Sequence, residues 1–65
     1  MEDYLREHLE KLREISQQDI DETSRLAKIN SLMILEHSSS VAQSNVEIRG
    51  LIKDAKAEYI RRLLS

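Results

Sequence analysis

The sequence predicts an all-α protein, an antiparallel helical hairpin that self-associates into a helical bundle. Apolar residues recur at helical spacing along two long segments, and the 65 residues include no proline and one glycine. Between these segments, Leu35–Val46 is rich in serine and asparagine, which favour helix starts over helix interiors. The aliphatic surface of the two helices also exceeds what they can cover for each other, which favours assembly.

The first helix is predicted from about residue 3 to about residue 37. At 100° per residue, one sector about 80° wide holds its apolar side chains, namely Leu5, Leu9, Leu12, Ile20, Ala27 and Ile34. This stripe keeps its phase throughout, which favours one uninterrupted helix. In an alternative that stays open, Asp19 or Asp21 caps a second helix and the chain forms a three-helix bundle. The pair Asp21 and Arg25, four residues apart, is expected on the solvated side.

The end of this helix is apolar in nearly every direction around its axis. The residues concerned are Ile29, Leu32, Met33, Ile34 and Leu35. A helix that is apolar all round is usually buried all round. One partner helix cannot cover such a surface, so at least two neighbours are expected here.

The bend of the hairpin is predicted at about residues 38–44. Two capping-box patterns lie close to it, Ser40-x-x-Gln43 and Ser44-x-x-Glu47, and each can begin a new helix. A continuous helix in a parallel coiled coil is the other alternative, because apolar residues repeat every seven positions through the serines: Ile20, Ala27, Ile34, Val41, Ile48 and Ala55. Polar residues at the companion positions 23, 30, 37 and 44 would weaken that seam, which favours the bend.

The second helix is predicted from about residue 45 to about residue 64. Its main stripe joins the first helix in a hairpin core, with the Tyr59 hydroxyl expected near water. A second row, spaced 4-3-4-3-4, includes Gly50 and Lys53. Gly50 indicates either close approach of another helix or a tolerated irregularity. The predicted core consists of Leu5, Leu9, Leu12, Ile20, Ala27, Ile34, Ile48, Leu51, Ile52, Ala55 and Tyr59.

The apolar surface that a single hairpin leaves uncovered predicts a contact with another chain. Its members lie on the second row and on the far side of the first helix: Leu32, Leu35, Val46, Gly50, Ala57, Ile60 and Leu64. The expected partner is a second copy of the chain, another helical protein, or both. The simplest assembly is a dimeric four-helix bundle, with residues 1–65 forming one interaction domain.

No residue pattern in the chain indicates catalysis, a cofactor or a metal site. There is no cysteine, and His8 and His37 belong to no metal-ligand spacing. A nucleophilic pairing of His37 with the neighbouring serines lacks a glycine-rich turn beside it for an oxyanion site. Asp54 and Glu58 form a carboxylate pair that is expected on the solvated surface. We therefore expect no enzymatic activity.

A basic line on the second helix, formed by Arg49, Lys53 and Lys56, is a possible contact surface. A net charge of −2 and the lack of aromatic residues between these cations disfavour nucleic acid as the partner. No apolar run reaches the 18 residues typical of a membrane span, and a cytoplasmic location is the default expectation. The expected function is a helical protein–protein interaction module, such as an assembly subunit, adaptor or small regulator. The alternative is a small nucleic-acid-binding regulator that uses the basic line.

Overall fold

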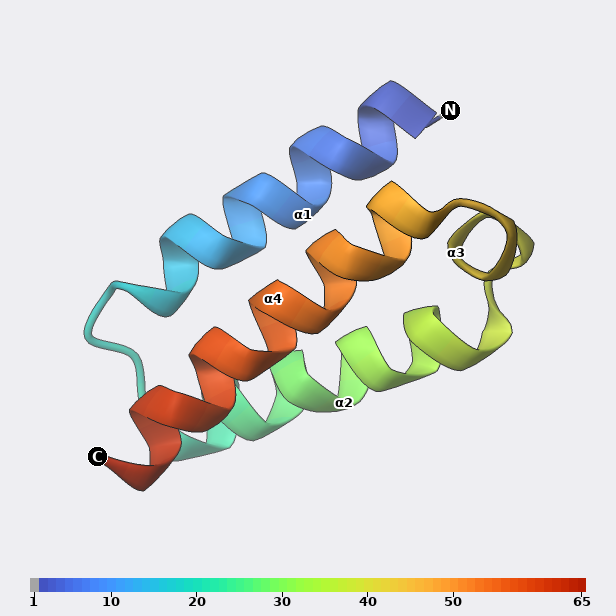
Figure 1. Cartoon of the computed structure of the whole chain (residues 1–65). Helices are drawn as coiled ribbons and strands as arrows, with labels where there is room; N and C mark the ends of the chain where they lie inside the picture. Colours follow the sequence, from blue (N-terminus) through green and yellow to red (C-terminus); the bar gives the residue numbers. More distant parts are fainter. Residues whose placement is uncertain (1) are drawn as a thin grey trace.

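The computed structural model describes residues 2–65, which form helices and short connections (Figure 1). The helices are α1 (Glu2–Ser16), α2 (Glu22–Ser38), α3 (Ser40–Ser44) and α4 (Val46–Leu64). Helix α4 lies in the middle, with α1 and α2 packed against it on either side (Figure 1). The short helix α3 links α2 to α4. The all-α prediction is confirmed for the described residues, whereas the two-helix hairpin is wrong.

The first predicted helix is in fact two helices. Helix α1 ends at Ser16, and α2 begins after Asp21, whose carboxylate accepts a hydrogen bond of 2.9 Å from the Ser24 backbone N–H. A side-chain oxygen at this position satisfies one of the backbone donors that a helix start leaves unpaired. The single helix over residues 3–37 is therefore corrected to the arrangement in which Asp21 caps a second helix.

The helix is interrupted at residues 17–21 although the apolar stripe keeps its phase there, and the packing of the helices explains why. One helix over residues 3–37 would be about 50 Å long, whereas the 19 residues of α4 span about 28 Å. Folding back at residues 17–21 brings Leu9 and Leu12 of α1 and Leu32 of α2 into one core with α4. Ile20 keeps the phase of the stripe, but it lies in the connection and packs against that core from there.

The second break lies where the sequence predicts it, although its caps differ. Ser39 caps α3 by accepting from the Ala42 N–H at 3.3 Å, and Asn45 caps α4 by accepting from the Ile48 N–H at 3.2 Å. The predicted caps, Ser40 and Ser44, lie one residue away, inside α3. The bend is thus one helical turn with a polar residue at each side, and the continuous helix is excluded.

The core lies along the side of α4 that faces the other helices. Its buried apolar residues are Leu9, Leu12, Leu32, Ala42, Ile48, Ile52, Ala55 and Tyr59. The other predicted core residues of α1, the connection and α4, namely Leu5, Ile20 and Leu51, are partly buried against them.

The core assignments of Ala27 and Ile34 are wrong, because both are exposed, Ile34 by 57%. In α2 the side facing the core carries Arg25 and Leu32. Each exposed residue follows one of these by two positions, which is about 200° around the helix. The prediction extended the apolar stripe of α1 into α2 as if the two were one helix, and it therefore assigned the wrong side of α2 to the core.

Two buried polar side chains connect α1 to the other helices. The Tyr59 hydroxyl was predicted to lie near water, but it is buried and donates to the Leu12 carbonyl oxygen at 2.6 Å. Burial raises the pKa of Tyr59. The Arg25 guanidinium donates to the carbonyl oxygens of Ser16 at 3.0 Å and Gln18 at 2.8 Å. Arg25 is therefore part of the interior, and its expected place on the solvated side is corrected.

Candidate interaction surface

Two rows of side chains, one on α2 and one on α4, form what we call the α2–α4 face, and all of their members are exposed except Ile29, which is half-buried against the core. Both rows follow the 4-3-4 spacing that places residues on one side of a helix. Its apolar members remain accessible: the exposed fraction is 49% for Leu26, 44% for Met33, 38% for Ile60 and 81% for Leu64. In full, the rows are Glu22, Leu26, Ile29 and Met33 on α2, and Lys53, Ala57, Ile60 and Leu64 on α4.

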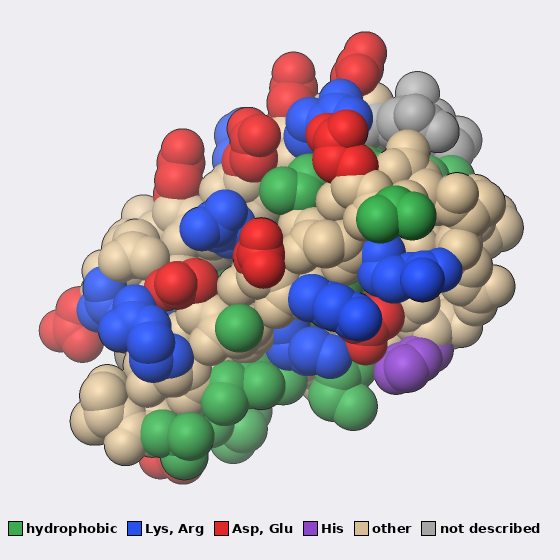
Figure 2. Space-filling model, viewed as in Figure 1, with side chains coloured by type: hydrophobic (Ala, Val, Ile, Leu, Met, Phe, Trp, Pro, Cys, Tyr) green, Lys and Arg blue, Asp and Glu red, His purple; other side chains and the backbone are tan. Residues whose placement is uncertain are grey.

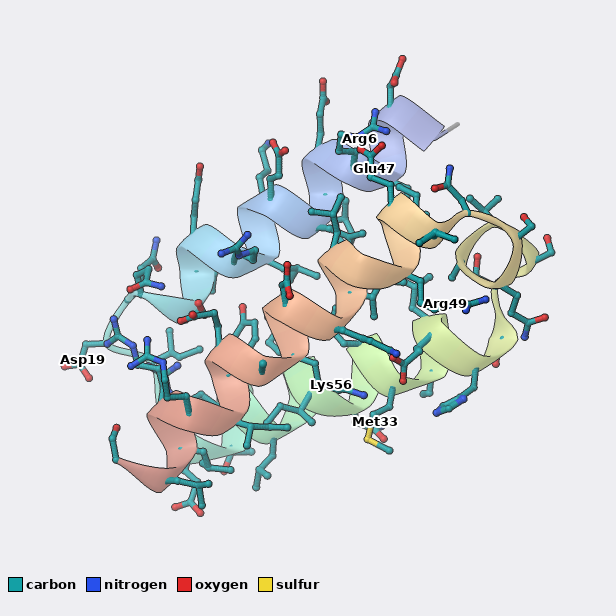
Figure 3. All side chains as sticks on the ribbon, viewed as in Figure 1. Arg6, Asp19, Met33, Glu47, Arg49 and Lys56 are labelled. Carbon is teal, nitrogen blue, oxygen red and sulfur yellow. The ribbon has the colours of Figure 1, made fainter. Side chains whose placement is uncertain are left out.

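An ion pair shows that the two rows lie on adjoining sides of their helices. Lys56 Nζ is 2.9 Å from Glu36 Oε1. Glu36 follows Met33 by three residues, and Lys56 precedes Ile60 by four, so each belongs to the side that carries a row. Figure 2 shows hydrophobic side chains gathered over α2 and the C-terminal half of α4, and Figure 3 shows Met33 below Lys56 in this region. The apolar members therefore form one strip across two helices.

The two ends of this strip carry opposite charges. Glu22 begins the α2 row and Lys53 begins the α4 row. Helices α2 and α4 run antiparallel (Figure 1), so the start of the α2 row and the start of the α4 row lie at opposite ends of the strip. Glu22 therefore belongs to the end where the α4 row finishes with Leu64, and Lys53 to the end where the α2 row finishes with Met33. Both residues are exposed, and neither forms an ion pair with a residue whose side chain the structure describes.

The residues predicted for the self-association face divide between surface and interior. Those of α4 lie outside: Val46 is 81% exposed, and Ala57, Ile60 and Leu64 belong to the α2–α4 face. Leu32 is 1% exposed, so this assignment is wrong, and Leu35 is half-buried against the core. The α2 members of the face, Leu26 and Met33, were not singled out for it. The sequence feature that could have identified them is their separation by seven residues, with Ile29 between them, which places all three on one side of a helix.

Gly50 has no close neighbour in the described chain. A Cβ atom built on it would meet nothing within 4 Å outside its own helix. Close approach of another helix is thus not the reason for glycine here within one copy of the chain. The tolerated irregularity is the reading that this geometry fits.

Two of the three cations in the predicted basic line are held within the chain. Arg49 donates to the carbonyl oxygens of Ala42 at 3.4 Å and of Gln43, where α3 ends. Lys56 bonds to Glu36, and this hydrogen bond lowers the pKa of Glu36 despite partial burial. Lys53 is exposed, and it lines a hollow together with Glu36, His37, Gln43 and Arg49.

The remaining titratable residues considered for chemistry have structural or surface contacts. His8 stacks on Tyr4 with 6.5 Å between ring centroids, and His37 Nε2 lies 3.5 Å from Glu36 Oε1. Glu58 accepts from Arg61 at 2.8 Å and from Gln17 at 3.3 Å, while Asp54 is exposed. Across residues 2–65, no three side chains of His, Asp or Glu are grouped as metal ligands.

Comparison with known proteins gives no guide to function. No family model matches the chain, and neither a curated protein nor a solved structure shows significant similarity to it. Within residues 2–65, no helix combines the length and the apolar character needed to cross a bilayer.

Proposed function

We propose that the chain is a non-enzymatic protein-interaction module that works through self-association, with the α2–α4 face as its contact surface. The occupant of this face is a second copy of the chain. One observation carries the proposal: a continuous apolar strip remains exposed across two helices that already pack against each other. Large exposed apolar patches are uncommon on monomeric proteins and usually mark binding sites.

The size of the chain sets the expected strength of this contact. A standard protein interface buries about 800 Å² on each partner, which is roughly a fifth of the 4460 Å² accessible surface. The strip mixes long aliphatic side chains with Ala57 and has charged ends, unlike the more hydrophobic interfaces of obligate dimers. We therefore expect a reversible dimer with a dissociation constant in the micromolar range.

The nucleic-acid alternative gains no support from the position of the basic residues. Arg49 and Lys56 are bonded to groups of the same chain, so a phosphate would compete with those contacts. Lys53 alone among the three remains without such a bond in the described residues. An interface to nucleic acid commonly needs several free cations in one place.

Sedimentation equilibrium across about 1–200 µM protein tests the proposal. The wild type should show a mass that rises with concentration toward that of a dimer. The variant Ala57→Glu/Leu64→Glu should remain monomeric, because it places two carboxylates within the strip. Both sites are exposed, so circular dichroism should show that the helices are retained.

A matched control is provided by the side of α2 that points away from the core, about 100° around the helix from the α2 row. The variant Ala27→Glu/Ile34→Glu also replaces an exposed alanine and an exposed large aliphatic residue, with the same change in net charge. It should dimerise like the wild type. A wild type that stays monomeric throughout, or equal loss of dimer in both variants, would contradict a role for the α2–α4 face in self-association.

A further inference from the structure

We propose that the two copies meet across a twofold axis that places Glu22 of each copy against Lys53 of the other. This inference rests on the proposed function and specifies the arrangement of the dimer. The observation that motivates it is the pair of opposite charges at the ends of the strip, both exposed and both unpaired among the described side chains.

The two charges occupy diagonally opposite corners of the α2–α4 face. Glu22 begins the row on α2 and Lys53 begins the row on α4, and the two helices are antiparallel. A twofold axis that lies in the plane of contact, perpendicular to this diagonal, exchanges the two corners. Each copy then presents its glutamate to the lysine of the other, and the contact is closed and self-complementary.

Other twofold arrangements of the same face leave these charges without partners. An axis parallel to the helices places Glu22 against Leu64 of the other copy. An axis that lies in the plane of contact and is perpendicular to the helices places Glu22 against Met33 of the other copy. Either arrangement brings a charged group against an apolar side chain, which removes water from the charge without providing a counterion.

The charged corners set the orientation of the two copies, and the apolar centre supplies the association. Leu26, Ile29 and Ile60 lie between the corners and are covered in the dimer. Ion pairs at the rim of an interface act mainly on specificity and on the association rate, and salt weakens them. The arrangement therefore predicts which charge variants pair with each other.

The test uses two charge reversals, Glu22→Lys and Lys53→Glu, alone, mixed and combined. Each variant alone places like charges at both corners and should dimerise roughly tenfold more weakly than the wild type. In an equimolar mixture, both corners of the mixed dimer regain opposite charges. Native mass spectrometry, with one variant isotope-labelled, should then show mixed dimers well above the statistical half. The combined variant Glu22→Lys/Lys53→Glu should dimerise like the wild type.

A control pair on α1 separates this effect from general electrostatics. Glu10→Lys and Lys11→Glu change exposed residues outside the α2–α4 face by the same charges. Their mixture should give statistical dimers, and 0.5 M salt should reduce the preference of the Glu22 and Lys53 variants toward the same value.

Each result decides between the arrangement and the broader proposal. Statistical mixing of Glu22→Lys with Lys53→Glu, in a protein whose dimer is still lost in Ala57→Glu/Leu64→Glu, overturns the arrangement and leaves the proposed function standing. A wild type that never dimerises overturns both. An excess of mixed dimers together with a restored combined variant supports the diagonal pairing.

Discussion

Arg25 lies in α2, but its guanidinium satisfies backbone groups at the end of α1. The Ser16 carbonyl oxygen ends α1 without a partner in that helix, whereas the Gln18 carbonyl oxygen lies in the connection and also accepts from the Ile20 N–H at 3.0 Å. Each of the two accepts a hydrogen bond from Arg25. The C-terminus of a helix also favours a positive charge. This combination explains how an arginine that is 7% exposed can lie in the interior without an acidic partner among the side chains that the structure describes.

Replacing Arg25 by alanine should therefore destabilise the protein by about 2–3 kcal/mol, because two carbonyl groups lose a charged donor and the buried alkyl chain is lost. Arg25→Lys should fall between this variant and the wild type, since one ammonium group reaches two carbonyls less well than a planar guanidinium. Urea unfolding at pH 7 measures both. Arg13→Ala, at an exposed site on α1, is the control and should cost under about 0.5 kcal/mol. Equal stability of all four proteins would contradict a structural role for Arg25.

The Glu36–Lys56 ion pair should make stability depend on pH in the acid range. The hydrogen bond from Lys56 lowers the pKa of Glu36 below its ordinary value of 4.5 in the folded protein. The unfolded chain then binds a proton more readily, so the stabilisation is present at neutral pH and is lost as the pH falls through about 4.5 and below.

Urea midpoints measured from pH 7 to about pH 3 should show a shallower acid loss for Glu36→Gln than for the wild type. Some loss should remain, because hydrogen bonding to Arg61 lowers the pKa of Glu58 as well. Glu10→Gln, at an exposed site, is the control and should follow the wild-type curve. A Glu36→Gln curve parallel to the wild type would mean that this pair contributes nothing to the acid response.

At the scale of the helices, each new start within the chain uses a short polar side chain. Asp21, Ser39 and Asn45 each accept a hydrogen bond from a backbone N–H three residues further on. These residue types are the ones that favour helix N-termini. The sequence contains more candidates than helices, so the type of residue alone does not select the cap.

Asp19 and Asp21 provide a direct test of the α2 start. Asp21→Ala should cost about 1 kcal/mol in urea unfolding, because the Ser24 N–H loses its acceptor. Asp19→Ala removes the same carboxylate two residues earlier, at an exposed position in the connection, and should cost under about 0.5 kcal/mol. A larger loss of stability in Asp19→Ala than in Asp21→Ala would place the cap at Asp19.

The helical nature of the chain and the apolar row of α4 could be predicted from the sequence, because both depend on local spacing. The break at residues 17–21 was predicted only as the alternative in which Asp19 or Asp21 caps a second helix, since Ile20 keeps the phase of the stripe while lying outside a helix. The same continuity hid which side of α2 faces the core, so Ile34 was placed inside and Leu32 outside. The candidate face was accordingly predicted on α4 and missed on α2.

For the whole molecule, the central position of α4 determines where each surface lies. Helices α1 and α2 pack on different sides of α4 (Figure 1), and α1 makes its polar contacts with α4 through Glu47 and Tyr59, which are not members of the α2–α4 face. Arg6 and Glu47 make one of these contacts, with Arg6 Nε 2.8 Å from Glu47 Oε1 (Figure 3). Self-association through the α2–α4 face would therefore leave α1 uncovered.

The central position of α4 also determines the order in which the chain can fold. The Glu36–Lys56 contact closes a segment of 20 residues, whereas Arg6–Glu47 and Tyr59–Leu12 close segments of 41 and 47. Doubling the length of a closing segment costs about 0.6 kcal/mol in chain entropy, or roughly a threefold slower encounter. We therefore expect α2 to dock on α4 before α1 does. The surface proposed for dimer formation is then complete before the monomer is, so assembly can begin while α1 is still undocked.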